Sequence, residues 1–256
     1  MKKALLYTLY FVSISLVAGA VCSWVYPLFA DHVETVDSGL LVLTSAASSI
    51  LCLVVFLSLR FVRLSPAWLL RGRTSWTILL LCVLAALGSL APSMWLQEQM
   101  PDLSDLLEKE FIAIMSRPEG YAVLALFAPL VEEVVFRGAV LRSLLDDSRI
   151  RPLWAVVISA LLFALIHLNP AQMPHAFLLG LLLGWVYYRT GSILPGVAVH
   201  WANNTCAYVL FLLYPDPNLQ LSDLFGSPLR IGLSILYSLM IFVPSLYLLK
   251  KQTDTP

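Results

Sequence analysis

The chain has 256 residues, of which 59% are hydrophobic and only 12% are charged. Soluble domains usually carry about 25% charged residues, so this composition indicates a membrane protein. The 16 basic and 16 acidic residues give no net charge, which argues against a nucleic-acid partner. The four cysteines lie in apolar stretches and are expected to be reduced packing residues rather than a disulfide framework.

Eight apolar stretches are candidates for membrane-spanning helices, since a span needs about 20 mostly apolar residues. They cover roughly 4–27, 38–59, 74–96, 121–145, 152–168, 173–189, 193–214 and 229–249. The first follows Lys2 and Lys3 as a signal peptide would, but its apolar run exceeds the usual length of roughly 7–15 residues, so we expect a retained span. The sequence predicts an all-α fold, a polytopic membrane helical bundle of about eight transmembrane helices, with residues 1–256 forming a single membrane domain.

The connections between these stretches differ in charge. If the N-terminus lies inside, the inner segments hold 12 lysines and arginines and the outer loops hold 3. By the positive-inside rule this asymmetry predicts a multi-pass protein with both termini in the cytoplasm, in the plasma membrane if the source is bacterial. In the outer connection 97–120, apolar residues recur at helical spacing and predict a short interfacial helix; they are Leu103, Leu106, Leu107, Phe111 and Ile114.

Three ionisable residues stand in the middle of the fourth stretch. A charge at the centre of a membrane helix costs about 2.5–3.5 kcal/mol, so Glu132, Glu133 and Arg137 are expected to serve a purpose there. Glu133 and Arg137 are spaced i,i+4 and are expected to form a structural ion pair. Glu132 points about 100° away from Glu133, so it is not expected to join the ion pair and is available for another role.

Two later stretches each carry a histidine with an i,i+4 partner. Phe163 and His167 are paired in this way on the fifth stretch, and His200 and Asn204 on the seventh. A single histidine or asparagine in a membrane helix is more often a packing or hydrogen-bonding residue than a catalyst. Their combination with Glu132, on three stretches with few other polar groups, favours a functional site.

Two further polar residues give a weaker signal. His175, beside Pro174 at the mouth of the sixth stretch, is expected to be a loop residue. Asn203 is expected to face another direction than its neighbour Asn204 and to be of secondary importance. Neither is assigned to the candidate site.

Three motifs built from these residues resemble those of the CPBP family. Glu132-Glu133-Val-Val-Phe-Arg137 matches EExxxR, Phe163-Ala-Leu-Ile-His167 matches FxxxH, and His200-Trp-Ala-Asn-Asn204 matches HxxxN. The family comprises the type II CAAX prenyl endopeptidases and bacterial relatives, including bacteriocin-processing or immunity proteins once called abortive-infection proteins. The resemblance covers about 121–214, the expected catalytic core, and leaves the first three stretches and the last without a motif.

The resemblance implies an intramembrane endopeptidase that acts on a peptide or a membrane protein in the lipid bilayer. By analogy, Glu132 and His167 would activate a water molecule as general base. His200 and Asn204 would then donate hydrogen bonds to the developing oxyanion. The ion pair on the fourth stretch would support the helix that carries the glutamate.

The cofactor expected from the resemblance is either none or zinc. Glu132, His167 and His200 have suitable ligand chemistry for zinc, with a position left open for water. Asn204 lies one turn from His200 and suits an oxyanion donor better than a zinc ligand. We therefore expect a metal-free site and keep a metalloprotease as the alternative.

Two functions outside proteolysis stay open. A proteolytically silent member of the same family would act as a membrane partner or a bacteriocin-immunity protein. A proton or ion transporter would use the glutamate and histidines as a relay, although the hydropathy shows no inverted repeat or matching pair of broken helices. Other intramembrane proteases fit poorly, because the sequence has no HExxH motif, no suitably placed GxSxG motif and no aspartate within the eight stretches.

Overall fold

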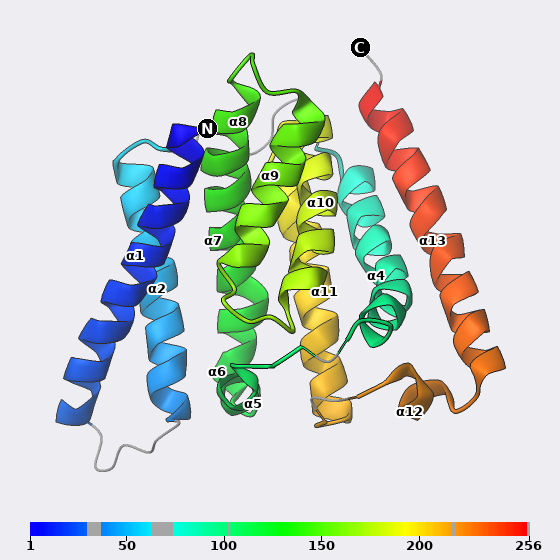
Figure 1. Cartoon of the computed structure of the whole chain (residues 1–256), viewed down its shortest axis with the longest axis horizontal. Coiled ribbons are helices and arrows are strands. Elements are labelled where there is room, and N and C mark those ends of the chain that lie inside the picture. Colours follow the sequence, from blue (N-terminus) through cyan, green and yellow to red (C-terminus); the bar gives the residue numbers. More distant parts are fainter. Residues whose placement is uncertain (30–36, 63–73, 102, 217–218, 255–256) are drawn as a thin grey trace.

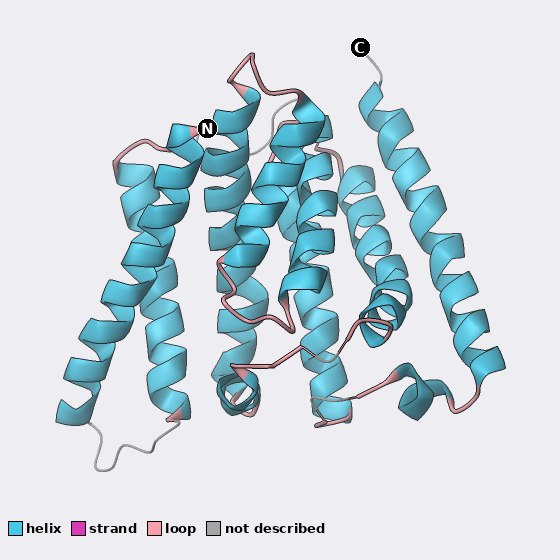
Figure 2. Ribbon diagram, viewed as in Figure 1, coloured by secondary structure: helices cyan, strands magenta, loops and turns pink. Residues whose placement is uncertain are grey.

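The computed structural model describes residues 1–29, 37–62, 74–101, 103–216 and 219–254. Within these ranges every regular element is a helix and there are no strands, which confirms the predicted all-α fold (Figure 2). The long helices stand side by side, and the start of the first helix lies at the same end of the bundle as the end of the last (Figure 1).

Eight long helical stretches in the described residues coincide with the eight predicted ranges. Seven are single elements: α1 (Lys2–Val25), α2 (Ser38–Ser58), α4 (Trp76–Glu98), α9 (Pro152–Leu165), α10 (Met173–Thr190), α11 (Leu194–Leu213) and α13 (Pro228–Asp254). The eighth, here called the central helix, comprises α6 (Pro118–Tyr121), η2 (Ala122–Phe127), α7 (Ala128–Glu132), η3 (Glu133–Leu141) and α8 (Arg142–Leu145). Short elements connect them: η1 (Tyr26–Leu28), α5 (Glu108–Met115) and α12 (Leu221–Phe225).

Four helices in the described part of the chain are long and apolar enough to cross a membrane by length and composition. They are Lys2–Leu28, Ser38–Ser58, Trp76–Glu98 and Pro228–Asp254. The shorter helix α9 is also apolar. The chain is thus a polytopic membrane bundle, and the number of eight spans stays a prediction.

The bundle has three parts from one side to the other (Figure 1). Helices α1 and α2 pack on each other, and α1 also contacts η3. Helices α9, α10 and α11 surround the central helix, while α4 joins α11 to the outlying α13. Gly88 allows α4 and α13 to approach closely, because a β-carbon there would lie 2.6 Å from the backbone nitrogen of Phe242.

The central helix departs from the α-helical geometry that the sequence analysis assumes. Segments η2 and η3 are π-helical and flank the single α-helical turn α7. Pro129 has no backbone N–H and cannot complete the bond to the carbonyl of Ala125, which accounts for the wide turns of η2. No local feature of this kind explains η3. Both glutamates therefore lie at the boundary between α7 and η3, and π-helical turns are frequent at functional sites.

Three local predictions differ from the structure in where a helix begins or ends. Helix α9 ends at Leu165 instead of 168, and Leu168 has a left-handed backbone with φ 51°, so His167 lies in the turn after the helix. His175 belongs to the first turn of α10 and is not a loop residue. The predicted interfacial helix is present only as α5, so its earlier leucines lie outside the helix.

Candidate active site

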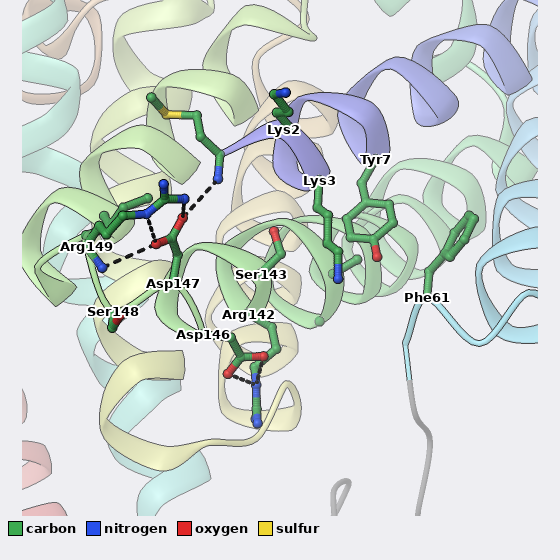
Figure 3. A pocket seen from close by; sticks show the side chains of 14 residues that line it. Lys2, Lys3, Tyr7, Phe61, Arg142, Ser143, Asp146, Asp147, Ser148 and Arg149 are labelled. Carbon is green, nitrogen blue, oxygen red and sulfur yellow. Dashed lines mark hydrogen bonds and ion pairs between the residues drawn. The ribbon is translucent and has the colours of Figure 1, made fainter.

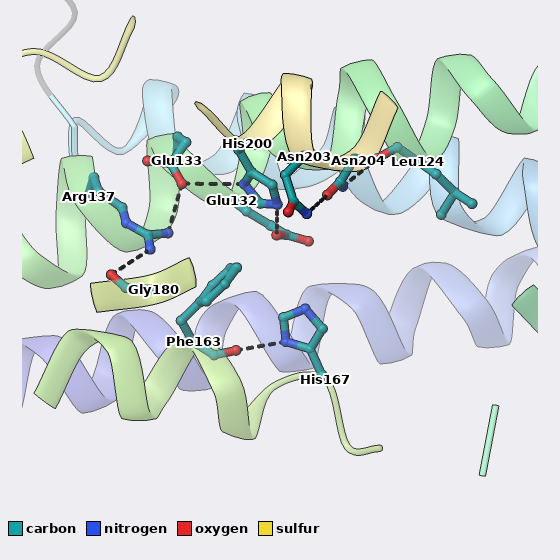
Figure 4. A network of polar contacts seen from close by, with 10 residues as sticks. All are labelled: Leu124, Glu132, Glu133, Arg137, Phe163, His167, Gly180, His200, Asn203 and Asn204. Carbon is teal, nitrogen blue, oxygen red and sulfur yellow. Dashed lines mark hydrogen bonds and ion pairs between the residues drawn. The ribbon is translucent and has the colours of Figure 1, made fainter. Parts of the chain in front are cut away.

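A buried ion pair lies at the centre of the bundle (Figure 4). Arg137 Nη1 donates to Glu133 Oε1 at 2.8 Å, and both side chains are 0% exposed. Arg137 Nη2 also donates to the carbonyl of Gly180 at 3.3 Å, and the guanidinium lies 4.6 Å from the ring centroid of Phe163. The pair expected from the i,i+4 spacing is present, and it joins the central helix to α9 and α10.

Helix α11 passes close to the same pair. A β-carbon at Gly196 would lie 2.4 Å from Glu133 Oε2, so a larger residue there would force the carboxylate to shift. His200 follows Gly196 by about one helical turn and is therefore directed at the same region of the central helix. The glycine thus fixes the depth at which the imidazole meets the glutamates.

His200 stands between the two glutamates. Its Nε2 lies 3.7 Å from Glu132 Oε2, and its Nδ1 lies 3.5 Å from Glu133 Oε1. The imidazole side chain is 4% exposed, whereas that of Glu132 is 16% exposed. The two adjacent glutamates therefore differ in environment: Glu133 is enclosed and paired with arginine, and Glu132 reaches an open side of the bundle.

That open side is a hollow of about 260 Å³ between α1, α2 and the first half of the central helix. Glu132 and Leu124 form part of one wall. The opposite side is rich in hydroxyl groups, contributed by Ser15, Thr44, Ser45, Ser48 and Ser49. We call it the hydroxyl-lined hollow. Polar side chains from otherwise apolar helices are thereby gathered beside Glu132.

Asn203 and Asn204 are joined by a side-chain hydrogen bond. Asn203 Nδ2 donates to Asn204 Oδ1 at 3.1 Å, and Asn204 Nδ2 donates to the carbonyl of Leu124 at 2.9 Å. The two side chains leave the helix in different directions but still reach each other, which joins Asn203 to the polar groups around Asn204. Since the Asn204 oxygen is held by Asn203, its amide nitrogen is oriented toward the carbonyl of Leu124.

His167 approaches from the opposite side, beyond the end of α9. Its Nδ1 lies 2.8 Å from the carbonyl oxygen of Phe163, and because a carbonyl only accepts, that nitrogen carries the hydrogen. The neutral ring then has its lone pair on Nε2, the nitrogen on the side facing Glu132 in Figure 4. The ring of Phe163 separates the two histidines, with centroids 5.0 Å from His167 and 5.8 Å from His200.

His175, which the sequence analysis left out of the candidate site as a loop residue, is a polar neighbour of the site residues. It lies within hydrogen-bonding range of Asn203 and interacts electrostatically with both His167 and His200. The available signal was Pro174, because proline is favoured in the first turn of a helix and so predicts that α10 already includes His175.

The structure brings Glu132, His200 and Asn204 together along the central helix and α11, with His167 across the ring of Phe163. In the described residues, no three histidine, cysteine, aspartate or glutamate side chains converge as a set that could hold a metal ion. The implied zinc ligands Glu132, His167 and His200 therefore do not fit a three-ligand site in this arrangement.

Comparison with known proteins agrees with the motifs. Residues 119–206 match the family model described as type II CAAX prenyl endopeptidase Rce1-like. Neither a search of curated proteins nor a search of solved structures found a match. The matched segment contains the central helix almost entirely, together with α9, α10 and the part of α11 that carries the candidate site.

Replacement of Arg137 by glutamine is expected to destabilise the protein strongly. The carboxylate of Glu133 would be left buried without a cation, which typically costs about 3–5 kcal/mol. The apparent melting temperature of the purified protein in detergent measures the loss. The matched control is Arg142→Gln, since Arg142 pairs with Asp146 at the same i,i+4 spacing but with 51% and 61% of the side chains exposed. This exposed pair is expected to contribute less than about 1 kcal/mol, and equal losses in the two variants would contradict a supporting role for the buried pair.

Proposed function

Because residues 119–206 match the family model described as type II CAAX prenyl endopeptidase Rce1-like, we propose that this chain is an intramembrane endopeptidase that uses Glu132 to hydrolyse a peptide bond. The proposal rests on the different environments of the two glutamates. Glu133 is committed to Arg137, whereas Glu132 faces the hydroxyl-lined hollow with its Oε2 3.7 Å from His200 Nε2.

Glu132 acts as the general base in this mechanism. Its carboxylate removes a proton from a water molecule in the hollow, and the water oxygen attacks the carbonyl carbon of the peptide bond. His167 assists through Nε2, whose lone pair is available because Nδ1–H donates to the carbonyl of Phe163. The proton then passes to the leaving amine as the tetrahedral intermediate collapses.

His200 and Asn204 stabilise the negative charge that develops on the carbonyl oxygen. Donors held in place before the reaction are effective in a site that excludes bulk water. Asn204 suits this role because Asn203 holds its oxygen and Leu124 accepts only one of its two N–H groups. Asn203 is therefore a positioning residue, which prevents the Asn204 amide from turning its oxygen toward the substrate.

The substrate is proposed to be a peptide or a membrane protein that enters through the hydroxyl-lined hollow. This hollow is open toward the bundle surface between α1, α2 and the central helix, and it combines apolar walls with serine and threonine hydroxyls. An extended peptide needs partners for its backbone amides when it leaves water, and these hydroxyls supply them. A prenylated CAAX peptide is the probe that the family suggests.

Variants of the proposed catalytic residues test the mechanism. Glu132→Gln, His167→Ala and His200→Ala are each expected to abolish cleavage of an internally quenched, farnesylated CAAX peptide. Asn204→Ala is expected to retain a measurable rate, because loss of one oxyanion donor typically lowers the rate by about 10²–10³-fold. Initial rates are measured on protein whose melting temperature shows that it is folded.

The matched control for Glu132→Gln is Glu119→Gln, which removes an exposed carboxylate within the same family segment. Glu119→Gln is expected to keep full activity. Full activity of Glu132→Gln would remove the enzymatic proposal and favour a proteolytically silent membrane partner.

The site is further proposed to work without a metal ion, because its donor groups do not converge as a three-ligand set. Protein purified without added metal is expected to contain far less than one zinc per chain by mass spectrometry and to keep its activity after chelation. Stoichiometric zinc, with activity lost on its removal and restored by zinc alone, would contradict this proposal and assign Glu132, His167 and His200 as ligands.

Both termini are proposed to lie in the cytoplasm. The first residues of α1, the loop after α8 and the last turn of α13 share one end of the bundle, and this end carries most basic residues of the described chain (Figure 1). In a variant without the four native cysteines, Ser148→Cys is expected to react with an impermeant thiol reagent only from inside, and Lys109→Cys from outside. Reversed accessibility at both positions would overturn this orientation.

A further inference from the structure

A second and larger hollow, of about 920 Å³, lies at the end of the bundle where α1 begins. It is lined by the first turns of α1, the end of the central helix and the loop that follows (Figure 3). Glu132, His200 and Asn204 do not line it, so it is separate from the candidate active site. Its size is within the range of about 300–1,000 Å³ that is typical of ligand sites. We call it the basic hollow.

The wall of the basic hollow carries more cations than anions. Its two carboxylates are each paired with an arginine: Arg142 Nε lies 2.9 Å from Asp146, and Arg149 Nη2 lies 2.8 Å from Asp147. The Arg149 guanidinium holds the pKa of Asp147 well below its usual range, so this carboxylate stays ionised and engaged with its partner. The arginines are thereby neutralised but keep further N–H groups to donate.

Lys2 and Lys3 supply the excess positive charge. Both residues are on the first turn of α1 and line the hollow; in Figure 3 the Lys3 side chain extends beside Tyr7, and Lys2 lies on the other side of the helix. Within the described part of the chain, neither lysine takes part in a salt bridge. The hollow therefore has two side-chain cations without an internal counterion, and this excess of positive charge favours an anionic group such as a lipid phosphodiester.

One side of the hollow is largely apolar (Figure 3). Tyr7 and Phe61 line it with ring centroids 5.0 Å apart, and Ala139 of the central helix contributes a small apolar surface. A neighbouring hollow of about 350 Å³ shares Arg149 and contains Trp154, whose side chain is well exposed. Tryptophan is enriched at the membrane–water interface, so this end of the bundle combines headgroup-level anchors with basic residues.

We propose that the basic hollow binds the phosphate group of an anionic phospholipid, with Lys2 and Lys3 contacting the phosphate and the Tyr7–Phe61 surface contacting the glycerol and upper acyl chain. A free phosphate ion could contact the same lysines, but it would leave the apolar Tyr7–Phe61 surface uncovered. Basic pockets at the ends of membrane helices are suited to anionic headgroups, and each lysine near the surface strengthens the attraction.

The test compares lipids that differ only in headgroup. The full-length protein in detergent is titrated with phosphatidylglycerol, with phosphatidylcholine of the same chains, and with inorganic phosphate, and binding is followed by native mass spectrometry and by melting temperature. Phosphatidylglycerol is expected to bind more tightly than phosphatidylcholine and to raise the melting temperature. Equal binding of the two lipids would overturn the proposal, and equal binding of inorganic phosphate would overturn the assignment to a lipid.

Variants that remove lysine charges test where on the protein the lipid binds. Lys2→Gln/Lys3→Gln is expected to weaken phosphatidylglycerol binding by roughly 30-fold, as the loss of two lysines near the headgroup predicts. The matched control is Lys250→Gln/Lys251→Gln, which removes two exposed lysines at the same end of the bundle and is expected to leave binding unchanged. Equal weakening in both variants would show attraction by overall charge and contradict a specific site.

A second variant covers the case in which the lysine changes impair membrane insertion. Ser148→Glu places a carboxylate at an exposed loop position on the wall of the basic hollow without altering α1. It is expected to weaken phosphatidylglycerol binding and to leave phosphatidylcholine binding unchanged. Undiminished preference for phosphatidylglycerol in Ser148→Glu would contradict the proposed location. None of these measurements requires proteolysis, so their outcome is independent of the proposed enzymatic activity.

Discussion

The structure depends on the need to neutralise a buried charge. An arginine that is 0% exposed inside an apolar bundle is tolerated only with a close counterion and hydrogen-bond acceptors. Glu133 provides the counterion from the same helix, Gly180 provides a carbonyl from α10, and Phe163 provides an aromatic face from α9. Gly196 lets α11 approach the carboxylate from the remaining side. One ion pair thereby fixes the relative positions of four helical stretches.

This ion pair also determines the environment of Glu132, the residue that precedes Glu133 in the sequence. Since Glu133 is occupied by Arg137, Glu132 meets His200 on one side and the hydroxyl-lined hollow on the other. The hollow gives the carboxylate polar surroundings in a region that is otherwise apolar. Two identical side chains, adjacent in sequence, therefore have different surroundings, because only one of them is fully enclosed.

Much of the bundle follows from local sequence properties, whereas several details of the site do not. The lengths of the apolar runs predict the positions of the helices, and the i,i+4 spacing predicts the buried ion pair. The π-helical segments, the bond between Asn203 and Asn204, and the position of His167 beyond α9 are not predictable in this way. They depend on contacts between helices that are distant in sequence, as does the placement of His175 beside Asn203. The hollows likewise arise only when several helices are assembled.

The central claim is that Glu132 activates water and does not attack the substrate itself. The most direct test is to run many turnovers on the farnesylated peptide in ¹⁸O-labelled water and to analyse both product and digested enzyme by mass spectrometry. Water activation predicts ¹⁸O in the new carboxylate of the product and none in the enzyme peptide that contains Glu132. Incorporation of ¹⁸O into Glu132 would contradict the claim, because it would show that its carboxylate forms a covalent anhydride with the substrate.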